Sequence, residues 1–235
     1  MMRLDKYLSE LGIASRKELK DIIKAGKVSV NGAVVSLPDF KLDPEKDSVH
    51  LNGELLQWSR FRYFMMDKPC GVLTASTDKK QQTVIDLLPE SLQRIGLFPV
   101  GRLDKDTSGL LLLTNDGDFA HKVISPKYEI KKRYYAVTDG EPDENDVKSF
   151  ASGLVLRDGL KCLPARLELI GSNKCIVTVM EGKYHQVRRM LAAVGKPVLE
   201  LRRLSIGSLE LNPDMDRGDF VELSQTEIEK IFTVK

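Results

Sequence analysis

The feature that most constrains this chain is residues 101–113, where a polar loop leads directly into an uninterrupted apolar run. Residues 109–113 predict a buried strand, and the loop before them carries Arg102 and Asp104. A strand that anchors a loop in the core holds the loop's side chains in a defined place. An arginine two residues from an aspartate can keep the carboxylate ionised, although an ordinary surface ion pair would use the same residues.

The rest of the chain after about residue 60 mixes strands and helices without regular alternation, which favours an α+β fold over a doubly wound parallel sheet. Apolar patterns predict further strands at 63–66, 134–137, 166–170, 176–180, 198–204 and 220–223. Helices are predicted at 84–88, 118–124, 144–151, 185–194 and 225–232, the last beginning with a Ser224–Glu227 capping box.

The first residues form a compact module of a different kind. Leu4, Tyr7, Leu8 and Leu11 recur at helical spacing, and a second helix begins at a Ser15–Glu18 capping box. The turns Asn31-Gly32 and Asn52-Gly53 each lie between short apolar runs, which predicts two hairpins. The pattern lapses near Trp58, so we expect a small α/β domain at 1–58 and a larger domain at 59–235.

Basic charge is concentrated in two places although the net charge is only +2. Residues 182–203 hold six basic residues and one acidic residue, and residues 1–35 hold seven basic residues against four acidic ones. Such clusters suit contact with a phosphodiester backbone, although a solvated charged face would look the same. The N-terminal cluster consists of Arg3, Lys6, Arg16, Lys17, Lys20, Lys24 and Lys27.

Two further segments could bind a nucleic acid. Lys183, His185, Arg188 and Arg189 surround the start of the predicted helix at 185–194, where backbone N–H groups favour anions. His185 could equally be a structural residue. In residues 131–137, two tyrosines follow Lys132 on a predicted strand, so that one can pack in the core while the other stacks on a base.

The three cysteines form no CxxC pair and have no histidine at metal-ligand spacing, so we expect no metal site. No apolar run approaches the length of a membrane span and no signal segment is visible. We therefore expect a cytoplasmic protein that has no membrane association.

Five segments, taken together, resemble those of a pseudouridine synthase that carries an N-terminal S4 RNA-binding domain. The run RLDKYLSELGIASRKELKDIIKAGKVSVNG is similar to the S4 domain, and GRLDKDTSGLLLLTNDG resembles the central synthase motif. RYFMMDKPCGVL, KKRYYAV and EGKYHQVRRM are similar to the other synthase motifs, with Asp67 where many relatives have Asn. The resemblance covers nearly the whole chain and implies a mainly antiparallel mixed sheet with flanking helices in the larger domain.

The resemblance also implies roles for individual residues. Asp104 takes the place of the catalytic aspartate and Tyr134 that of the tyrosine that stacks on the base. Either Arg188 or Arg189 would pair with Asp104, while Arg102, Lys132 and His185 would contact the substrate. Neither a metal nor an organic cofactor is implied.

The form Tyr184-His185-Gln186-Val187 is similar to the group named for the small-subunit (16S) rRNA enzyme RsuA. We therefore expect a monomer that isomerises one uridine of small-subunit rRNA, whether naked or in an assembly intermediate. A large-subunit (23S) enzyme of the same group is an alternative, and so is a non-catalytic S4-type assembly factor. A glycoside hydrolase is disfavoured because the loop offers a single carboxylate where such enzymes generally use two.

Overall fold

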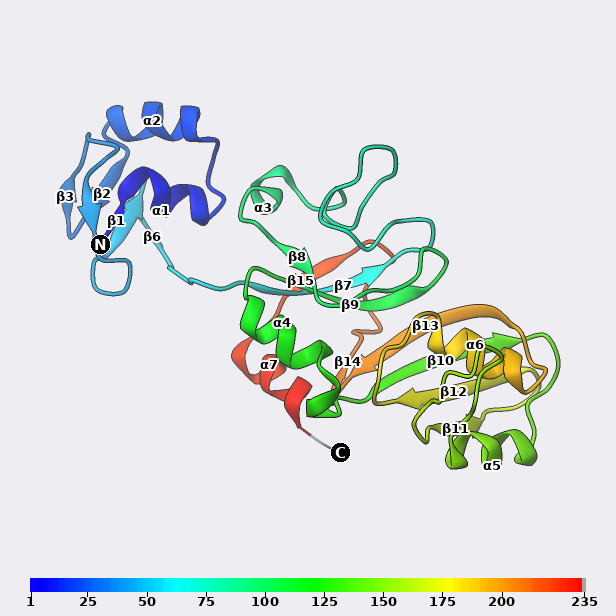
Figure 1. Ribbon diagram of the computed structural model, residues 1–235. Coiled ribbons are helices and arrows are strands. Elements are labelled where there is room, and N and C mark those ends of the chain that lie inside the picture. Colours follow the sequence, from blue (N-terminus) through cyan, green and yellow to red (C-terminus); the bar gives the residue numbers. More distant parts are fainter. Residues whose placement is uncertain (234–235) are drawn as a thin grey trace. The chain divides into compact units, whose positions relative to one another are not determined.

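A computed structural model describes residues 1–233 of the chain, which divide into two compact units (Figure 1). The first unit comprises residues 1–62 together with 88–97, and the described part of the second comprises 63–87 together with 98–233. The mixed α/β composition of both units agrees with the predicted α+β class.

The first unit contains the predicted helices and both predicted hairpins. Its helices are α1 (Leu4–Glu10) and α2 (Arg16–Lys24), and the predicted Ser15–Glu18 capping box is present at the start of α2. A four-stranded sheet has the order β3 (Ala33–Val34), β2 (Val28–Val30), β5 (Val49–Leu51), β6 (Glu54–Leu56), and β1 (Met2–Arg3) pairs with β4 (Lys41–Leu42). Asn31 and Asn52 have positive φ angles, as the turns of two-residue hairpins require.

A segment of the predicted second domain packs with the first unit. Residues 88–97 contain the short helix α3 (Glu90–Gln93), and a Cβ built on Gly12 would lie 2.5 Å from the carbonyl oxygen of Ser91. Glycine is therefore required where these two backbones approach each other. Periodicity in a sequence could not reveal this contact.

The second unit is built on one large mixed sheet. Its main strands, in spatial order, are β11 (Arg166–Leu169), β12 (Lys174–Val179), β10 (Lys132–Thr138), β13 (Val198–Ile206), β9 (Ser108–Thr114), β7 (Tyr63–Lys68) and β15 (Phe220–Glu222). The short strands β8 (Phe98–Pro99) and β14 (Leu209–Glu210) pair with β9 and β13. β13 and β9 pair in parallel and the other main pairs are antiparallel, so the predicted mainly antiparallel mixed sheet is confirmed.

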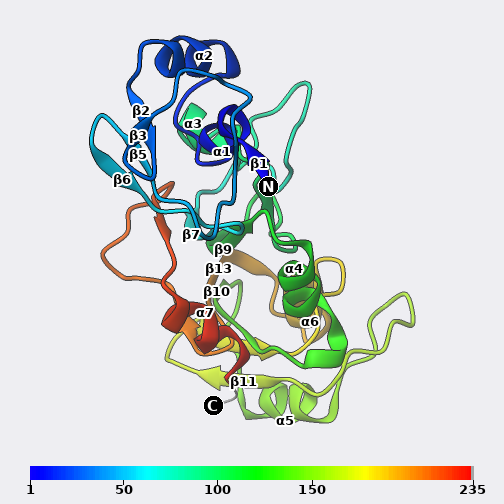
Figure 2. The same ribbon diagram turned by 90° about the vertical axis from the view of Figure 1, so that its left-hand side faces the viewer.

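Two pairs of helices cover different parts of this sheet (Figures 1 and 2). Near β7 and β9, α4 (Gly117–Ile124) and α7 (Gln225–Phe232) enclose a core that includes Met65, Leu110 and Leu112. Over β10 and β12, α5 (Glu144–Ser152) and α6 (Gln186–Ala193) enclose a second core. Every residue of β9 is buried, because the strand lies between two neighbours in the middle of the sheet.

The prediction of a helix at 84–88 is wrong. These residues form turns, in which the Thr83 backbone N–H and hydroxyl both donate to the carboxylate of Asp86. A short apolar run can be buried without being helical, and Val84 and Leu88 are indeed buried. Of the elements missed in the sequence, a 3₁₀ turn at Pro126–Tyr128 and the two-residue strands are too short to give a periodic signal.

Candidate active site

The loop that carries Asp104 is held in place by the strand that follows it. The Thr107 N–H donates to the Asp104 carbonyl at 3.0 Å, and β9 begins at the next residue. On the other side, the Thr74 hydroxyl donates to the Leu103 carbonyl at 2.7 Å. The Asp104 side chain keeps 27% of its surface exposed, so its carboxylate is accessible from a rigid loop.

A buried lysine fixes the inner side of the same loop. The Lys68 side chain is fully buried, and its Nζ donates to the carbonyls of Pro69 (3.0 Å), Asp104 (3.2 Å) and Thr107 (3.0 Å). Burial lowers the pKa of Lys68 to about 8, while nearby Cys70 and the loop aspartates oppose this shift. Lys68 was not among the residues predicted from the sequence, although a lysine within an apolar strand signals an unusual environment.

Asp67, the departure from the resembling motif, forms a buried ion pair. Its Oδ2 accepts a hydrogen bond of 2.6 Å from Arg202, and its side chain is fully buried. Arg202 faces Ser108 where β13 pairs with β9, so this ion pair lies next to the strand that carries the Asp104 loop. The positive charge of Arg202 thus offsets part of the free-energy cost of removing the Asp67 carboxylate from water.

Helix α6 and the residue just before it bring two basic side chains to Asp104. The Nε2 of His185 lies 3.3 Å from one carboxylate oxygen, and the Nε of Arg188 lies 4.0 Å from the other. Arg188 also donates to the Asp106 carbonyl at 3.2 Å and pairs with the Asp106 carboxylate at 3.0 Å. The two arginines that the sequence could not separate therefore differ, since Arg189 pairs with Asp158 at 2.6 Å instead.

The turn that precedes α6 is fixed by two buried polar side chains. Gln186 donates to Glu181 at 2.8 Å and accepts from the Lys183 N–H at 3.0 Å, and Glu181 also accepts from the Leu163 N–H. Glu181 and Gln186 are 7% and 5% exposed. Neither residue was predicted as part of the site, because only the folded turn reveals the hydrogen bond between them.

A small cavity of about 70 Å³ lies beside Asp104. Tyr134 borders it, and Arg203 donates to the Tyr134 hydroxyl at 3.5 Å. Among the predicted site residues, those that line this cavity are Arg102, Asp104, Tyr134 and His185. A carboxylate, two basic groups and an aromatic ring thus meet at one opening, which suits attack on a planar base.

The remaining predicted residues lie elsewhere. Lys132 is 8% exposed and its Nζ donates to the Val123 carbonyl at 3.4 Å, so the structure places it in the core and not among the residues that line the cavity. Its pKa is lowered to about 8 by burial and by the nearby Arg203. The N-terminal basic residues all lie in the first unit with exposed side chains, and Lys17, Lys20 and Lys24 share one side of α2.

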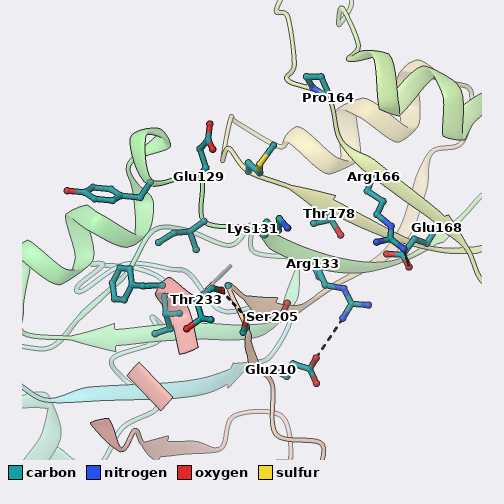
Figure 3. A pocket seen from close by; sticks show the side chains of 17 residues that line it. Glu129, Lys131, Arg133, Pro164, Arg166, Glu168, Thr178, Ser205, Glu210 and Thr233 are labelled. Atoms are coloured by element: carbon teal, nitrogen blue, oxygen red, sulfur yellow. Dashed lines mark hydrogen bonds and ion pairs between the residues drawn. The ribbon is translucent and has the colours of Figure 1, made fainter. Parts of the chain in front are cut away.

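A larger cavity of about 480 Å³ lies on the opposite face of the sheet (Figure 3). Arg133, one of its lining residues, precedes Tyr134 on β10, and successive side chains of a strand point to opposite faces. In Figure 3, Arg133 pairs with Glu210, and Arg166 lies beside Glu168. Its charges are therefore largely paired, and none of the predicted site residues lines it.

The chain is similar to several known proteins. Residues 62–193 match the RNA pseudouridylate synthase family and residues 2–54 match the S4 domain. A Bacillus subtilis RNA pseudouridine synthase, YtzG, is 42% identical over 97% of both chains. The ribosomal large subunit pseudouridine synthase B of Bacillus subtilis is 40% identical, over 98% of this chain and 96% of its own. The ribosomal small subunit pseudouridine synthase A of Escherichia coli is 36% identical, over 98% and 100%.

A solved structure is also similar along the whole chain. A crystal structure of a pseudouridylate synthase has a TM-score of 0.70 and 35% identity, covering 98% of this chain and 100% of its own. The chain therefore belongs to the RNA pseudouridine synthase family and carries an N-terminal S4 domain.

Within residues 1–233, three or more His, Cys, Asp or Glu side chains nowhere gather in a way that could hold a metal ion. None of the helices in that range is long and apolar enough to cross a membrane.

Proposed function

We propose that this protein converts one uridine of ribosomal RNA to pseudouridine, with Asp104 as the catalytic carboxylate. The observation that carries the proposal is the position of Asp104, between His185 at 3.3 Å and Arg188 at 4.0 Å, beside a cavity bordered by Tyr134. The family to which the chain belongs supplies the reaction class.

The reaction breaks the N1–C1′ bond of the uridine, turns the uracil and joins it again through C5. The target base must first leave its stack, which costs a few kcal/mol. Asp104 can act as nucleophile or base and stabilise positive charge on the sugar. In this proposal Tyr134 stacks on the uracil, and the exposed Arg102 holds the displaced nucleotide at the mouth of the cavity.

Arg188 would complete the site when RNA binds. Its Nε is buried and makes no hydrogen bond among the described residues. A buried donor without an acceptor costs about 1–3 kcal/mol, which closer approach of Asp104 or an oxygen of the substrate would offset. The other guanidinium nitrogens are already bonded to backbone carbonyls, so Arg188 is held ready for this contact.

We assign the first unit to RNA binding. Its exposed basic residues contact phosphates in this proposal, which positions the RNA without specifying its sequence. We favour small-subunit rRNA as the substrate because of the Tyr184-His185-Gln186 segment, and we propose a cytoplasmic monomer. A large-subunit substrate is the second candidate, because a large-subunit synthase is 40% identical.

The test is pseudouridine mapping, by carbodiimide labelling and primer extension, on unmodified small-subunit and large-subunit rRNA transcripts. We expect one new stop in the small-subunit transcript, absent with Asp104→Asn and retained with the exposed control Asp214→Asn. A stop in the large-subunit transcript alone would change the proposed substrate to large-subunit rRNA and leave the proposed chemistry unchanged. Full turnover by Asp104→Asn would refute the catalytic assignment, and RNA binding by the wild-type protein without any product would favour an assembly factor.

A further inference from the structure

Tyr184 is the most exposed aromatic side chain among the described residues. Its relative exposure is 72%, whereas Tyr128 has 42% and Phe232 has 40%. It does not line the cavity beside Asp104, but it precedes His185, which does. A tyrosine combines a flat apolar ring with a polar hydroxyl, so at the rim of the site it offers a contact surface for a planar ligand.

The Tyr184 ring is stacked on the ring of His185. Their centroids are 3.9 Å apart and their planes differ by 18°, while His185 in turn reaches Asp104. One face of the tyrosine is therefore covered by a residue of the site. The exposed remainder offers a second flat face of the size and polarity that a nucleobase covers.

The backbone that presents this ring pair is fixed. His185 has φ 48° and ψ 34°, a left-handed conformation that residues other than glycine adopt rarely. The buried Glu181–Gln186 bond and the Gln186 contact to the Lys183 N–H hold the turn on both sides. Such residues persist only where the surroundings determine them, and they cluster at functional sites.

We propose that Tyr184 is a stacking platform for the RNA base adjacent to the target uridine. This inference rests on the proposed function, because it takes the cavity beside Asp104 as the place of the target base. The base adjacent to the target uridine in the RNA would lie just outside that cavity, where Tyr184 is. Nearby basic side chains are engaged in ion pairs, Lys183 with Glu181, Arg188 with Asp106 and Arg189 with Asp158. The contact that Tyr184 itself offers is therefore stacking on a base.

The nature of the surface favours a base over a protein partner. Tyr184 is a single exposed ring, and the residues on either side of it, Lys183 and His185, are polar and line the cavity beside Asp104. Protein interfaces place aromatic anchors in fully desolvated apolar patches, with charge depleted from the core. Stacking on an aromatic ring tolerates any base, and we expect purines to bind best because their rings are larger.

The test uses a short single-stranded RNA in which one uridine lies between adenosines, with 2-aminopurine replacing either neighbour. Stacking quenches the fluorescence of 2-aminopurine. We expect quenching at one of the two positions with the wild-type protein, its loss with Tyr184→Ala together with a roughly 5- to 150-fold weaker Kd, and recovery with Tyr184→Phe. Tyr128→Ala, which removes an exposed tyrosine from the opposite face of the sheet, is the matched control and should behave as wild type.

Equal quenching and equal affinity for wild-type protein and Tyr184→Ala would overturn the platform. A second readout uses the uridine found by the rRNA mapping, in a substrate whose neighbouring nucleotide is abasic. Loss of that base and loss of Tyr184 should not add, because each removes the same contact, and additive losses in kcat/KM would also overturn the proposal. If quenching depends on Tyr184 but no pseudouridine forms, the stacking platform is supported and the proposed function is rejected. If pseudouridine forms without such quenching, the proposed function is supported and the stacking platform is rejected.

Discussion

Replacing Gly109 by alanine should strongly destabilise the second unit. Gly109 lies on β9 opposite Arg203 of β13, where the two strands pair in parallel. A Cβ built there would be 2.2 Å from the carbonyl oxygen of Arg203 and 2.7 Å from its nitrogen. The φ angle is +104°, which L-residues rarely adopt.

Two costs contribute to the expected loss of stability. The backbone conformation alone costs an alanine about 1–3 kcal/mol. The clash adds to it because the blocking atoms are backbone atoms that no rotamer change can move. β13 would have to retreat by more than about 1 Å to restore ordinary van der Waals contact, and each hydrogen bond lost between the strands costs about 0.5–1.5 kcal/mol. Together we expect about 3–5 kcal/mol, a large part of the stability of a typical domain.

Two other glycines of the second unit separate these costs. Gly171 has φ +97° and open space around its Cβ position, so Gly171→Ala should show the conformational cost alone. Gly117 has open space and no positive φ, so Gly117→Ala should stay within about 0.5 kcal/mol of wild type. Urea unfolding followed by circular dichroism gives the comparison. Trp58, stacked on Tyr7 in the first unit, gives a fluorescence signal that should not change.

The order of stabilities decides whether this reasoning is correct. We expect Gly117→Ala to be the most stable of the three variants and Gly109→Ala the least. If Gly109→Ala unfolds at the same urea concentration as Gly171→Ala, the close approach of β9 and β13 does not constrain the fold. The Asp104 loop would then have to be anchored by other contacts.

Two further predictions concern basic side chains. Lys132→Met should make the free energy of unfolding less dependent on pH. The folded-state pKa of Lys132 is lowered to about 8, so between pH 7 and pH 10 the folded wild-type protein loses this buried charge before the unfolded chain does. The free energy of unfolding of the wild type should therefore rise by roughly 2 kcal/mol relative to that of the variant over this range. Unfolding curves at both pH values measure this gap, and a constant gap would contradict it. Arg188→Gln should lower kcat roughly hundredfold with little change in Kd, because it removes a charge beside Asp104. In single-turnover assays the control Arg189→Gln, which loses the pair with Asp158 and a weak hydrogen bond to the Tyr184 carbonyl but no contact with Asp104, should stay close to wild type. Equal losses would refute the distinction.

Much of the architecture could be predicted from local signals in the sequence. The two Asn-Gly turns specify hairpins because their backbone twist matches that of the strands they join, and the Ser15–Glu18 box marks a helix start by satisfying free N–H groups. The apolar run after Asp104 indicated a buried strand, and the order of the motifs indicated the family. Each of these signals lies within a few residues of the element that it defines.

What the tertiary structure alone decided depends on contacts between residues far apart in the chain. Arg188 and Arg189 are chemically equivalent in the sequence, but neighbouring residues of a helix point in different directions, so one meets Asp104 and the other Asp158. Lys68 acts on a loop more than thirty residues away, by donating to carbonyls that carry no sequence signal. Local patterns thus determine which elements form, whereas packing determines which side chains share a site, because only the folded chain sets the distances between them.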